Sequence, residues 1–394
     1  MTIDRSTMSD NIFMKKALKL AARGKGRTSP NPLVGAIIVK DGKIIAADYH
    51  RKAGTPHAEV LALNQAGKRA RGATLYVNLE PCCHTEKRTP PCTKAIIRSG
   101  IKKVVVAMID PNPKVSGMGL KELRKAGIGT VSGIMEAEAK QLNEAFIKYI
   151  TKKPPFVILK IAQSLDGKIA TARGESKWIT GEKAREYVHK LRNEVDAILV
   201  GIGTVKKDNP SLDCRTRNGR NPYRIIVDSN LQISPDAKVL KHTEGKTIVA
   251  TIPPLLKGGI INSHFVKGGH RGIFSKKEYA DYQKKIEQLQ NMGAHVLNVK
   301  NSNGRVDLKR LMKELGRLEI TSIMIEGGSS INASALSSGI VDKVMIFIAP
   351  RIIGGADSIP SIGGKSPVLL KSAFNLKDIQ IKHPGEDILV EGYI

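Results

Sequence analysis

The stretch His57-Ala58-Glu59 precedes two proline–cysteine pairs, Pro81-Cys82 and Pro91-Cys92. Together they offer one imidazole and two thiolates as metal ligands, and one carboxylate that can remain free. A catalytic zinc site uses three protein ligands and keeps a fourth position for water. Bound zinc lowers the pKa of that water to about 7, and a nearby carboxylate can then carry protons. The stretch therefore predicts a hydrolytic zinc centre inside an α/β domain.

The residue order matches the signature H-x-E followed by P-C-x-x-C, which is typical of zinc deaminases acting on nucleobases. The prolines also agree. The cysteine spacing differs, because nine residues separate Cys82 from Cys92. We expect His57 and Cys92 to open helices, and thiolates are favoured at helix N-termini.

Longer motifs extend this pattern along the chain. In order they are Pro30-Asn31-Pro32-Leu33-Val34-Gly35, Gly54-Thr55-Pro56-His57-Ala58-Glu59-Val60, Leu79-Glu80-Pro81-Cys82, Arg88-Thr89-Pro90-Pro91-Cys92, Leu159-Lys160 and Ser164-Leu165-Asp166-Gly167. The first four resemble the deaminase half of the RibD family of bifunctional riboflavin-biosynthesis proteins. The last two resemble the start of that family's reductase half. The resemblance implies an α/β fold, with a cytidine-deaminase-like α/β/α sandwich followed by a dihydrofolate-reductase-like α/β domain.

The run Thr151-Lys152-Lys153-Pro154-Pro155 is the best domain boundary, because it is polar and its two prolines oppose a helix. We therefore predict two domains, over residues 1–150 and 155–394. The resemblance implies that the first is a zinc-dependent pyrimidine deaminase domain and the second an NADPH-dependent reductase domain. Apolar periodicity predicts alternating strands and helices in both domains, as in α/β proteins.

The first domain is expected to hold helices over 11–23, 57–67, 91–99, 121–125 and 136–148 and strands over 34–39, 43–47, 73–79, 104–108 and 128–131. The second is expected to hold strands over 156–161, 198–200, 224–227, 247–250, 322–325 and 344–348 and helices over 182–192, 308–315 and 331–336. Residues 252–290 match no motif of the family. We predict an exposed insertion there, leading into a helix near 279–289.

The composition of the 394 residues limits the class of protein. Hydrophobic residues make up 41%, enough for packed cores. No apolar run approaches the roughly 20 residues of a membrane helix, and the start lacks the apolar centre of a signal peptide. We therefore expect a soluble cytoplasmic protein. Four cysteines, three of them between residues 82 and 92, favour metal binding or chemistry over disulfides.

The net charge of +28 is spread over both halves of the chain. It has three interpretations: a solvated lysine-rich surface, steering of phosphorylated ligands, or nucleic-acid binding. Only 4% of the residues are aromatic, and base stacking on aromatic side chains is typical of nucleic-acid sites. We expect small phosphorylated pyrimidines as partners, no specific nucleic acid, no membrane, and a homo-oligomer, either a dimer or a tetramer.

The resemblance implies that His57, Cys82 and Cys92 bind one Zn²⁺ per chain and that Glu59 shuttles protons. The family run is Pro-Cys-Ser-His-x-Gly-Lys/Arg-Thr-Pro-Pro-Cys, whereas this loop is one residue longer and lacks the glycine. Cys83 therefore has the family spacing to the second cysteine, while Cys82 has the family Pro-Cys context. We favour Cys82, because the turn after its proline aims that side chain, and keep Cys83 as the alternative.

The resemblance also implies four contacts to the substrate of the deaminase half: Asn31, His50, His84 and Arg88. The last two apply if the extra loop residue lies within Thr85-Glu86-Lys87. Asn31 stands between two prolines, so it can also be read as a turn residue.

The second half has no G-x-G-x-x-G after a strand, so a Rossmann fingerprint is absent. Its Glu-Gly-Gly run at 326–328 and its Ser-Lys-Trp-Ile-Thr run at 176–180 instead resemble the family's reductase motifs. The resemblance implies NADPH contacts from Ala162, Trp178, Thr204, Asp208, Ser229, Gly328, Ser329, Ser330, Ile331, Asn332, Ala333 and Ser334. It implies substrate contacts from Lys160, Ser176, Arg192, Leu212, Arg215 and Glu326. Arginine suits a phosphate. The sequence leaves open whether Lys160, Asp208 or Glu326 donates a proton.

By this resemblance the first half deaminates 2,5-diamino-6-(5-phosphoribosylamino)pyrimidin-4(3H)-one with zinc. The second half reduces 5-amino-6-(5-phosphoribosylamino)uracil to the ribitylamino product with NADPH. Two alternatives remain. The charge of +28 suggests a nucleic-acid-editing deaminase, and the altered cysteine loop suggests a non-catalytic or single-activity protein.

Overall fold

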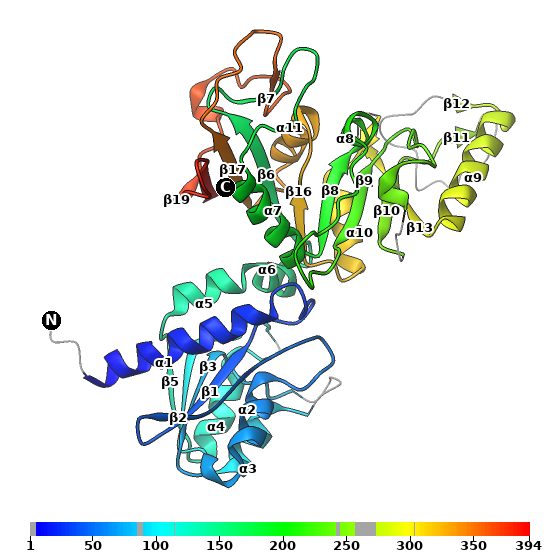
Figure 1. Cartoon of the computed structure of the whole chain (residues 1–394). Helices are drawn as coiled ribbons and strands as arrows, with labels where there is room; N and C mark the ends of the chain where they lie inside the picture. The colour runs from blue at the N-terminus through cyan, green and yellow to red at the C-terminus, as the bar shows by residue number, and fades with distance from the viewer. Residues whose placement is uncertain (1–4, 85–89, 114, 242–244, 257–272, 303) are drawn as a thin grey trace. The chain divides into compact units, whose positions relative to one another are not determined.

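The computed structural model describes residues 5–84, 90–113, 115–241, 245–256, 273–302 and 304–394 (Figure 1). The chain forms two compact units, residues 1–154 and 155–394. Strands alternate with helices in both, as the apolar periodicity predicts. Among the described residues, no helix combines the length and the apolar character needed to span a membrane.

The first unit is built on a five-stranded sheet in the order β2-β1-β3-β4-β5. Its strands are β1 (Gly35–Lys40), β2 (Lys43–Tyr49), β3 (Thr74–Leu79), β4 (Lys103–Met108) and β5 (Gly129–Ser132). β1 runs antiparallel to β2 and β3, whereas β3, β4 and β5 are parallel. Asp41 and Gly42 join β1 to β2 with φ of 49° and 71°. A type I′ hairpin turn needs positive φ at both central residues, and these two residues supply it.

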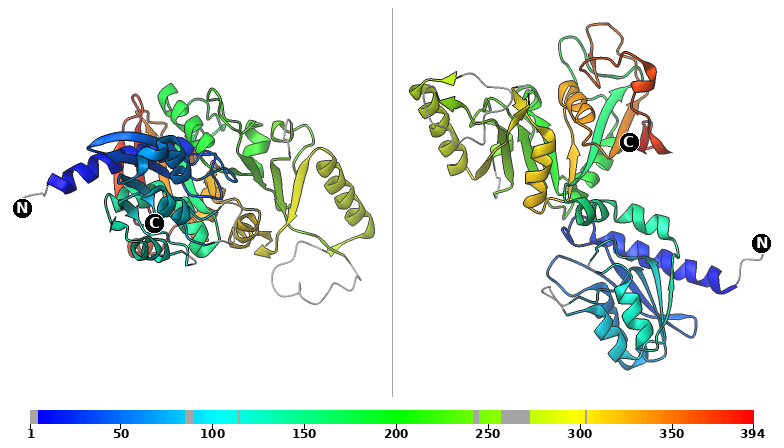
Figure 2. Two further views of the ribbon diagram at one scale, coloured as in Figure 1. Left: turned by 90° about the horizontal axis from the view of Figure 1, so that it is seen from below. Right: turned by 180° about the vertical axis from the view of Figure 1, so that it is seen from behind.

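Helices cover both faces of this sheet. They are α1 (Arg5–Ala21), α2 (Ala58–Ala66), α3 (Cys92–Ser99), α4 (Met118–Lys125), α5 (Glu136–Leu142) and α6 (Glu144–Lys152). α1 packs on α5, and on the other side α2 packs on α3 and α3 on α4 (Figures 1 and 2). The buried core lies between these layers and the sheet. The predicted α/β/α sandwich is therefore confirmed.

The single helix predicted over 136–148 is wrong, because the chain breaks at Asn143 between α5 and α6. The buried Asn143 side chain accepts a hydrogen bond from the Leu33 N–H (2.8 Å) and donates one to the Leu33 carbonyl (3.1 Å). Asn78 of β3 donates to the same carbonyl and accepts from the Gly35 N–H. These tertiary bonds outweigh local helix propensity. They also fix the segment that follows the Pro-Asn-Pro motif.

The second unit is built on a nine-stranded sheet in the order β13-β10-β9-β8-β16-β6-β17-β20-β19. Its strands are β6 (Phe156–Ser164), β8 (Ala197–Gly201), β9 (Tyr223–Val227), β10 (Thr247–Thr251), β13 (Ala294–Asn298), β16 (Ser322–Ile325), β17 (Lys343–Ala349), β19 (Lys377–Lys382) and β20 (Ile388–Tyr393). The first seven strands in the sheet order are parallel to one another. β20 pairs antiparallel with β17, and β19 pairs antiparallel with β20. The carboxyl ends of β9, β8, β16 and β6 therefore meet at one edge, where α/β sheets bind ligands.

The helices of this unit are α7 (Glu182–Glu194), α8 (Ile202–Asp208), α9 (Lys276–Asn291), α10 (Leu308–Arg317) and α11 (Ser329–Ser337). Three small sheets pair β7 (Lys168–Ala170) with β18 (Ile359–Pro360), β11 (Leu255–Leu256) with β12 (Ile273–Phe274), and β14 (Asn301–Ser302) with β15 (Arg305–Val306). The helix predicted near 279–289 is confirmed as α9, which starts at a Ser275–Glu278 capping box. Of the predicted insertion, residues 257–272 lie outside the described residues.

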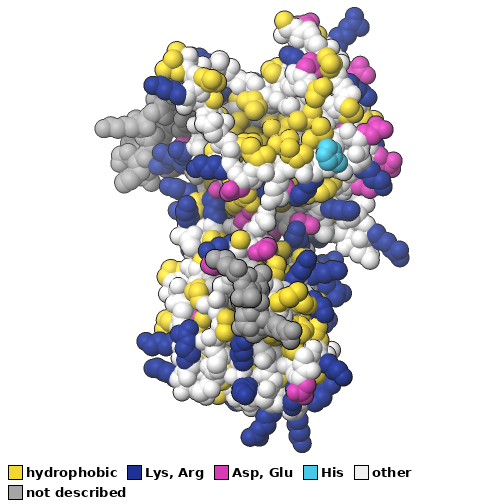
Figure 3. All heavy atoms as spheres, turned by 90° about the vertical axis from the view of Figure 1, so that its left-hand side faces the viewer, with side chains coloured by type: hydrophobic (Ala, Val, Ile, Leu, Met, Phe, Trp, Pro, Cys, Tyr) yellow, Lys and Arg dark blue, Asp and Glu magenta, His cyan; other side chains and the backbone are white. Residues whose placement is uncertain are grey.

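The C-terminal strands β19 and β20 were not predicted. β19 is the edge of the large sheet, and all six of its residues are exposed. Apolar side chains gather on the side of the second unit where β19 lies in Figure 1, as Figure 3 shows. Ile379 and Ile381 of β19 are 56% and 62% exposed, and Val368 in the preceding loop is 97% exposed. An edge strand of this kind offers unpaired backbone groups beside apolar surface.

Candidate active sites

The three residues that the sequence predicts as metal ligands lie together. Among the described residues, the ligand atoms of His57, Cys82 and Cys92 lie within 4.8 Å of one another. The His57 Nδ1 is 3.2 Å from the Cys92 Sγ and 3.5 Å from the Cys82 Sγ. Tetrahedral zinc with ordinary bond lengths would set such N···S edges at about 3.6 Å. The donor types and their spacing therefore fit zinc.

Two features distinguish Cys82 from its neighbour Cys83. The Cys92 N–H at the start of α3 donates to the Cys82 Sγ at 3.4 Å, and a helix N-terminus favours a thiolate. Burial raises the pKa of the Cys83 thiol, and the carboxylates of Glu122 and Glu80 raise it further. Cys83 is also absent from the three-residue group. The surroundings therefore disfavour a thiolate at Cys83.

Glu59 stands on the first turn of α2, two residues after His57. Its side chain is buried, and its Oε2 atom has no hydrogen-bond partner in the described part of the chain. Burial raises the pKa of Glu59, whereas the His57 imidazole opposes that rise. A buried carboxylate with a raised pKa and a free oxygen is suited to proton transfer.

Asn31 and His50 form a neutral hydrogen-bonded pair beside the group of His57, Cys82 and Cys92. The His50 Nδ1 is 3.3 Å from the Pro56 carbonyl, which can only accept, so Nδ1 carries the proton. The His50 Nε2 then accepts from the Asn31 Nδ2 at 3.2 Å. Burial lowers the pKa of His50, which keeps the ring neutral. The amide orientation leaves the Asn31 Oδ1 as an acceptor for a ligand N–H. The rings of His50 and His57 are 5.4 Å apart.

The two remaining predicted contacts belong to the altered loop. His84 is described and half-buried. Arg88 lies outside the described residues.

Sequence reasoning missed a structural role of Glu80, which joins β3 to the Pro81-Cys82 turn. The Glu80 carboxylate is buried and accepts three backbone hydrogen bonds. The donors are the N–H groups of Gly117 (2.8 Å), Leu120 (3.1 Å) and Asp110 (3.2 Å). The carboxylate thereby ties the end of β3 to the start of α4 and fixes the turn that presents Cys82. The Glu-Pro-Cys motif was the only sequence signal for this role, and sequence alone does not reveal which N–H groups bind the Glu80 carboxylate.

The second site is a cleft of about 1010 Å³ at the carboxyl ends of β6, β16, β8 and β9. With one exception, every residue predicted to contact the cofactor or substrate of the second half lines it. The exception is Ala333, whose side chain lies close to Gly364. Trp178 is 61% exposed in the cleft wall. The Arg185 guanidinium lies 4.6 Å from its ring centre, a cation–π contact that holds the indole in place.

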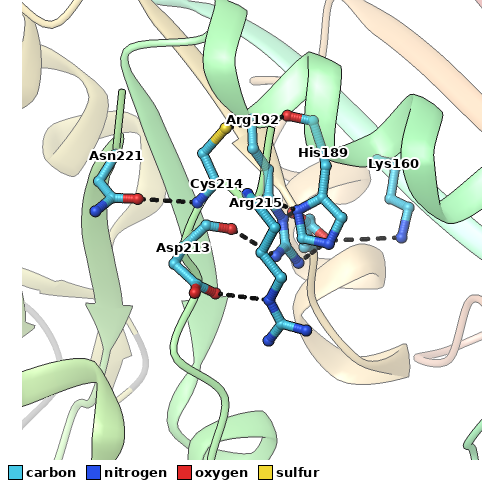
Figure 4. A network of polar contacts seen from close by, with 8 residues as sticks. Lys160, His189, Arg192, Asp213, Cys214, Arg215 and Asn221 are labelled. Carbon is cyan, nitrogen blue, oxygen red and sulfur yellow. Dashed lines mark hydrogen bonds and ion pairs between the residues drawn. The ribbon is translucent and has the colours of Figure 1, made fainter. Parts of the chain in front are cut away.

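A buried ion network forms the inner wall of the cleft (Figure 4). The Arg192 guanidinium contacts both carboxylate oxygens of Glu326, at 2.7 and 3.0 Å, and the Lys160 Nζ is 3.5 Å away from one of them. Burial raises the pKa of Glu326, but Arg192 and Lys160 outweigh burial and hold it at about 2. Burial lowers the pKa of Lys160, although Glu326 opposes this. Glu326 therefore stays ionised at neutral pH, which leaves Lys160 the better proton donor of the two.

The turn that carries Arg215 is held against α7 (Figure 4). The Arg215 N–H donates to the His189 Nδ1 at 3.4 Å, and the Cys214 N–H donates to the Asn221 Oδ1 at 2.9 Å. Arg192 donates to the Asp213 carbonyl at 3.0 Å. The Arg215 side chain itself is 62% exposed. Two guanidiniums thus reach one cleft from a fixed frame, an arrangement that suits a phosphate. Sequence reasoning missed His189.

The start of α11 lies in the same cleft and has the features that suit an anion. Gly328 is the N-cap and makes no side-chain cap, so the first backbone N–H groups of the helix stay available to a ligand. A Cβ on Gly327 would lie 1.8 Å from the Ile331 Cγ2, so glycine is required for this close packing. Thr204, at the start of α8, lies beside Gly328. A pyrophosphate fits this place.

Each unit of the chain matches a known protein family. Residues 7–108 match the cytidine and deoxycytidylate deaminase zinc-binding region. Residues 155–390 match the RibD C-terminal domain. Fold and sites thus define a two-part enzyme, with a zinc-binding deaminase half ahead of a reductase half.

Near-full-length relatives share this arrangement. The riboflavin biosynthesis protein RibD of Aquifex aeolicus is 46% identical, covering 97% of each chain. The RibD of Escherichia coli is 37% identical, covering 97% of this chain and 98% of its own. An Acinetobacter baumannii RibD structure has a TM-score of 0.83 at 34% identity, covering 98% of this chain and 99% of that chain. The chain belongs to the RibD family of bifunctional deaminase–reductases of riboflavin biosynthesis, which use zinc and NADPH.

The role of Glu80 can be tested through zinc binding. Glu80→Gln places an amide NH₂ against backbone N–H groups that need an acceptor, which loosens the turn before Cys82. We expect zinc affinity to fall about 10-fold or more, as for other residues that support metal ligands. The measurement is competition with a chromophoric chelator on the full chain.

The choice between the two cysteines can be tested in the same assay. Cys82→Ser should abolish zinc binding, whereas Cys83→Ser should retain it.

The matched control is Asp10→Asn, because Asp10 is a second buried carboxylate of the first unit, bonded to Tyr76 and Lys103. It should leave zinc affinity unchanged. An equal loss in both variants, or none in Glu80→Gln, would contradict the positioning role of Glu80.

Proposed function

We propose that the first unit deaminates 2,5-diamino-6-(5-phosphoribosylamino)pyrimidin-4(3H)-one and that the second unit reduces the product. A Thermotoga maritima structure with TM-score 0.81 and 37% identity, covering 99% of both chains, is described as a diaminohydroxyphosphoribosylaminopyrimidine deaminase and 5-amino-6-(5-phosphoribosylamino)uracil reductase. The observation that carries the proposal is the three-ligand group with Glu59 beside it, in the same chain as a phosphate-suited cleft.

In the proposed deamination, His57, Cys82 and Cys92 would hold zinc, which would supply a Lewis acid that lowers the pKa of water. Glu59 carries one proton of the attacking water to the ring nitrogen. It then carries the second proton, from the hydroxyl group added to the ring carbon, to the departing amine. The C–NH₂ bond breaks, a C=O bond forms, and one water is consumed for each ammonia released. The Asn31 Oδ1, oriented by His50, accepts an N–H of the pyrimidine.

In the proposed reduction, NADPH supplies a hydride to C1′ of the substrate after its sugar ring opens to an imine. Arg215 and Arg192 bind the phosphate, and Ser176 and Leu212 complete the substrate wall. Lys160, whose pKa burial lowers, donates the proton that balances the hydride. Glu326 stays ionised and holds Lys160 and Arg192 in position.

The proposed cofactor contacts follow the edge of the sheet. Ala162 and Trp178 lie toward the nicotinamide, and the start of α11 from Gly328 onward takes the pyrophosphate. Thr204, Asp208 and Ser229 complete this side of the cleft. His84 and Arg88 complete the deaminase substrate site by family resemblance. We further propose that the enzyme works in the cytoplasm on these small phosphorylated molecules and binds no specific nucleic acid.

The proton role of Glu59 predicts a selective loss. Glu59→Gln is nearly isosteric but cannot carry a proton, so deamination should fall about 10²–10⁴-fold while zinc content stays unchanged. The same variant should reduce pre-deaminated substrate at the normal rate. Ammonia release and NADPH oxidation are measured separately, with Glu136→Gln as the matched control, because Glu136 is a partly exposed carboxylate at the start of α5. Normal ammonia release by Glu59→Gln would refute the assignment.

The phosphate role of Arg215 predicts a loss confined to the second reaction. Charge-assisted hydrogen bonds are worth roughly 1.5–3 kcal/mol, so Arg215→Ala should lower reductase kcat/KM for the pyrimidine about 10-fold or more. Deamination and the KM for NADPH should not change. Arg217, exposed two residues later and outside the cleft lining, supplies the control Arg217→Ala. A loss in NADPH binding alone would place Arg215 in the cofactor site.

We also propose that the protein is a homo-oligomer that pairs through the exposed edge strand β19. An unpaired apolar edge favours pairing with a second copy. Light scattering of the full chain should then give a multiple of 42.8 kDa. Ile381→Lys on β19 should shift the mass toward one chain, whereas a monomeric wild type would contradict the proposal.

A further inference from the structure

The strand order fixes which way NADPH lies in the cleft of the second unit. This inference rests on the proposed function. The hydride must reach a substrate held near Lys160, Arg192 and Glu326, so the nicotinamide lies toward β6 and β16. With the pyrophosphate at the start of α11, the adenosine must extend past β8 toward the end of β9. The residues at the end of β9 therefore face the adenine ribose.

Two residues of the cleft lining, Ser229 and Arg305, lie on neighbouring segments there. The Ser229 Oγ accepts a hydrogen bond from the Val306 N–H at 3.1 Å, which leaves the Ser229 hydroxyl hydrogen available to a ligand. Arg305 directly precedes Val306 on β15 and lines the same cleft. Within the described residues, its guanidinium has neither an ion pair nor a hydrogen bond. A serine hydroxyl and an unpaired guanidinium thus lie on neighbouring segments at the adenosine end.

The end of β9 also carries Asp228, which needs a separate explanation. In Rossmann folds a carboxylate binds the ribose 2′-hydroxyl of NAD, whereas a nearby arginine accommodates the 2′-phosphate of NADP. Asp228 is fully buried, accepts a hydrogen bond from the Ile233 N–H at 2.7 Å, and is absent from the cleft lining. Its carboxylate is therefore turned into the loop. In the proposed orientation the ribose instead faces the Ser229 hydroxyl and the Arg305 guanidinium.

We propose that Arg305, together with Ser229, binds the 2′-phosphate of the adenine ribose and so selects NADPH over NADH. A phosphate monoester carries close to two negative charges at neutral pH. Arginine meets it with paired charge-assisted hydrogen bonds. The unphosphorylated cofactor offers Arg305 no such partner, so the arginine discriminates between the two cofactors by a group remote from the hydride.

The test compares nucleotide fragments that differ only in the 2′-phosphate. Calorimetry of the full chain with adenosine 2′,5′-bisphosphate and with adenosine 5′-monophosphate separates the two contributions. Arg305→Ala should weaken bisphosphate binding about 10-fold or more and leave monophosphate binding unchanged. In the reductase assay the KM for NADPH should rise by the same factor, and the KM for NADH should not. The matched control is Arg310→Ala, because Arg310 lies on α10, pairs with Asp307 and is outside the cleft lining.

Three outcomes would overturn the proposal. Equal weakening of both fragments would show a general effect of charge or structure, and unchanged bisphosphate binding would place the 2′-phosphate elsewhere. Failure of the bisphosphate to compete with NADPH in the wild type would instead refute the proposed cofactor orientation, on which Arg305 depends. All three results leave the proposed reductase function standing, because only the absence of substrate-dependent NADPH oxidation by the wild type would refute that function.

Discussion

Burial of an ionised carboxylate costs free energy unless hydrogen bonds or cations replace its water, and this constraint organises both sites. In the first unit, Glu80 at the end of β3 is satisfied by three backbone N–H groups, which draw the start of α4 toward the turn before Cys82. In the second unit, Glu326 at the end of β16 is satisfied by Arg192 of α7 and Lys160 of β6. Each carboxylate joins elements distant in sequence and thereby fixes the groups that carry the chemistry.

The two solutions differ in a way that suits the two reactions. Backbone N–H groups satisfy Glu80 without adding a cationic side chain. The His50 and Asn31 pair is neutral. Glu326 instead uses two cations, and its field opposes the fall in the pKa that burial causes at Lys160. A site for a phosphorylated sugar can use such cations.

Much of this arrangement could be predicted from sequence where a signal is local. The H-x-E and Pro-Cys patterns predicted that His57, Cys82 and Cys92 lie together. The apolar periodicity predicted most strands and helices. The break at Asn143 could not be predicted, because its partner Leu33 lies 110 residues away. The partners of Glu80 and the contact between His189 and the Arg215 turn are equally non-local. The edge strand β19 escaped prediction because an exposed strand has no buried face to create an apolar pattern.

The central claim is that one chain performs two reactions at two chemically distinct sites, and mass-resolved product analysis tests it most directly. The diaminopyrimidine phosphate is supplied to the full-length protein with NADPH, without NADPH, and after zinc removal by a chelator. The account predicts a deaminated and reduced product in the first case and a deaminated, unreduced product in the second. After zinc removal it predicts no deamination, while pre-deaminated substrate is still reduced. Deamination by the zinc-free protein, or loss of both reactions together, would contradict the account.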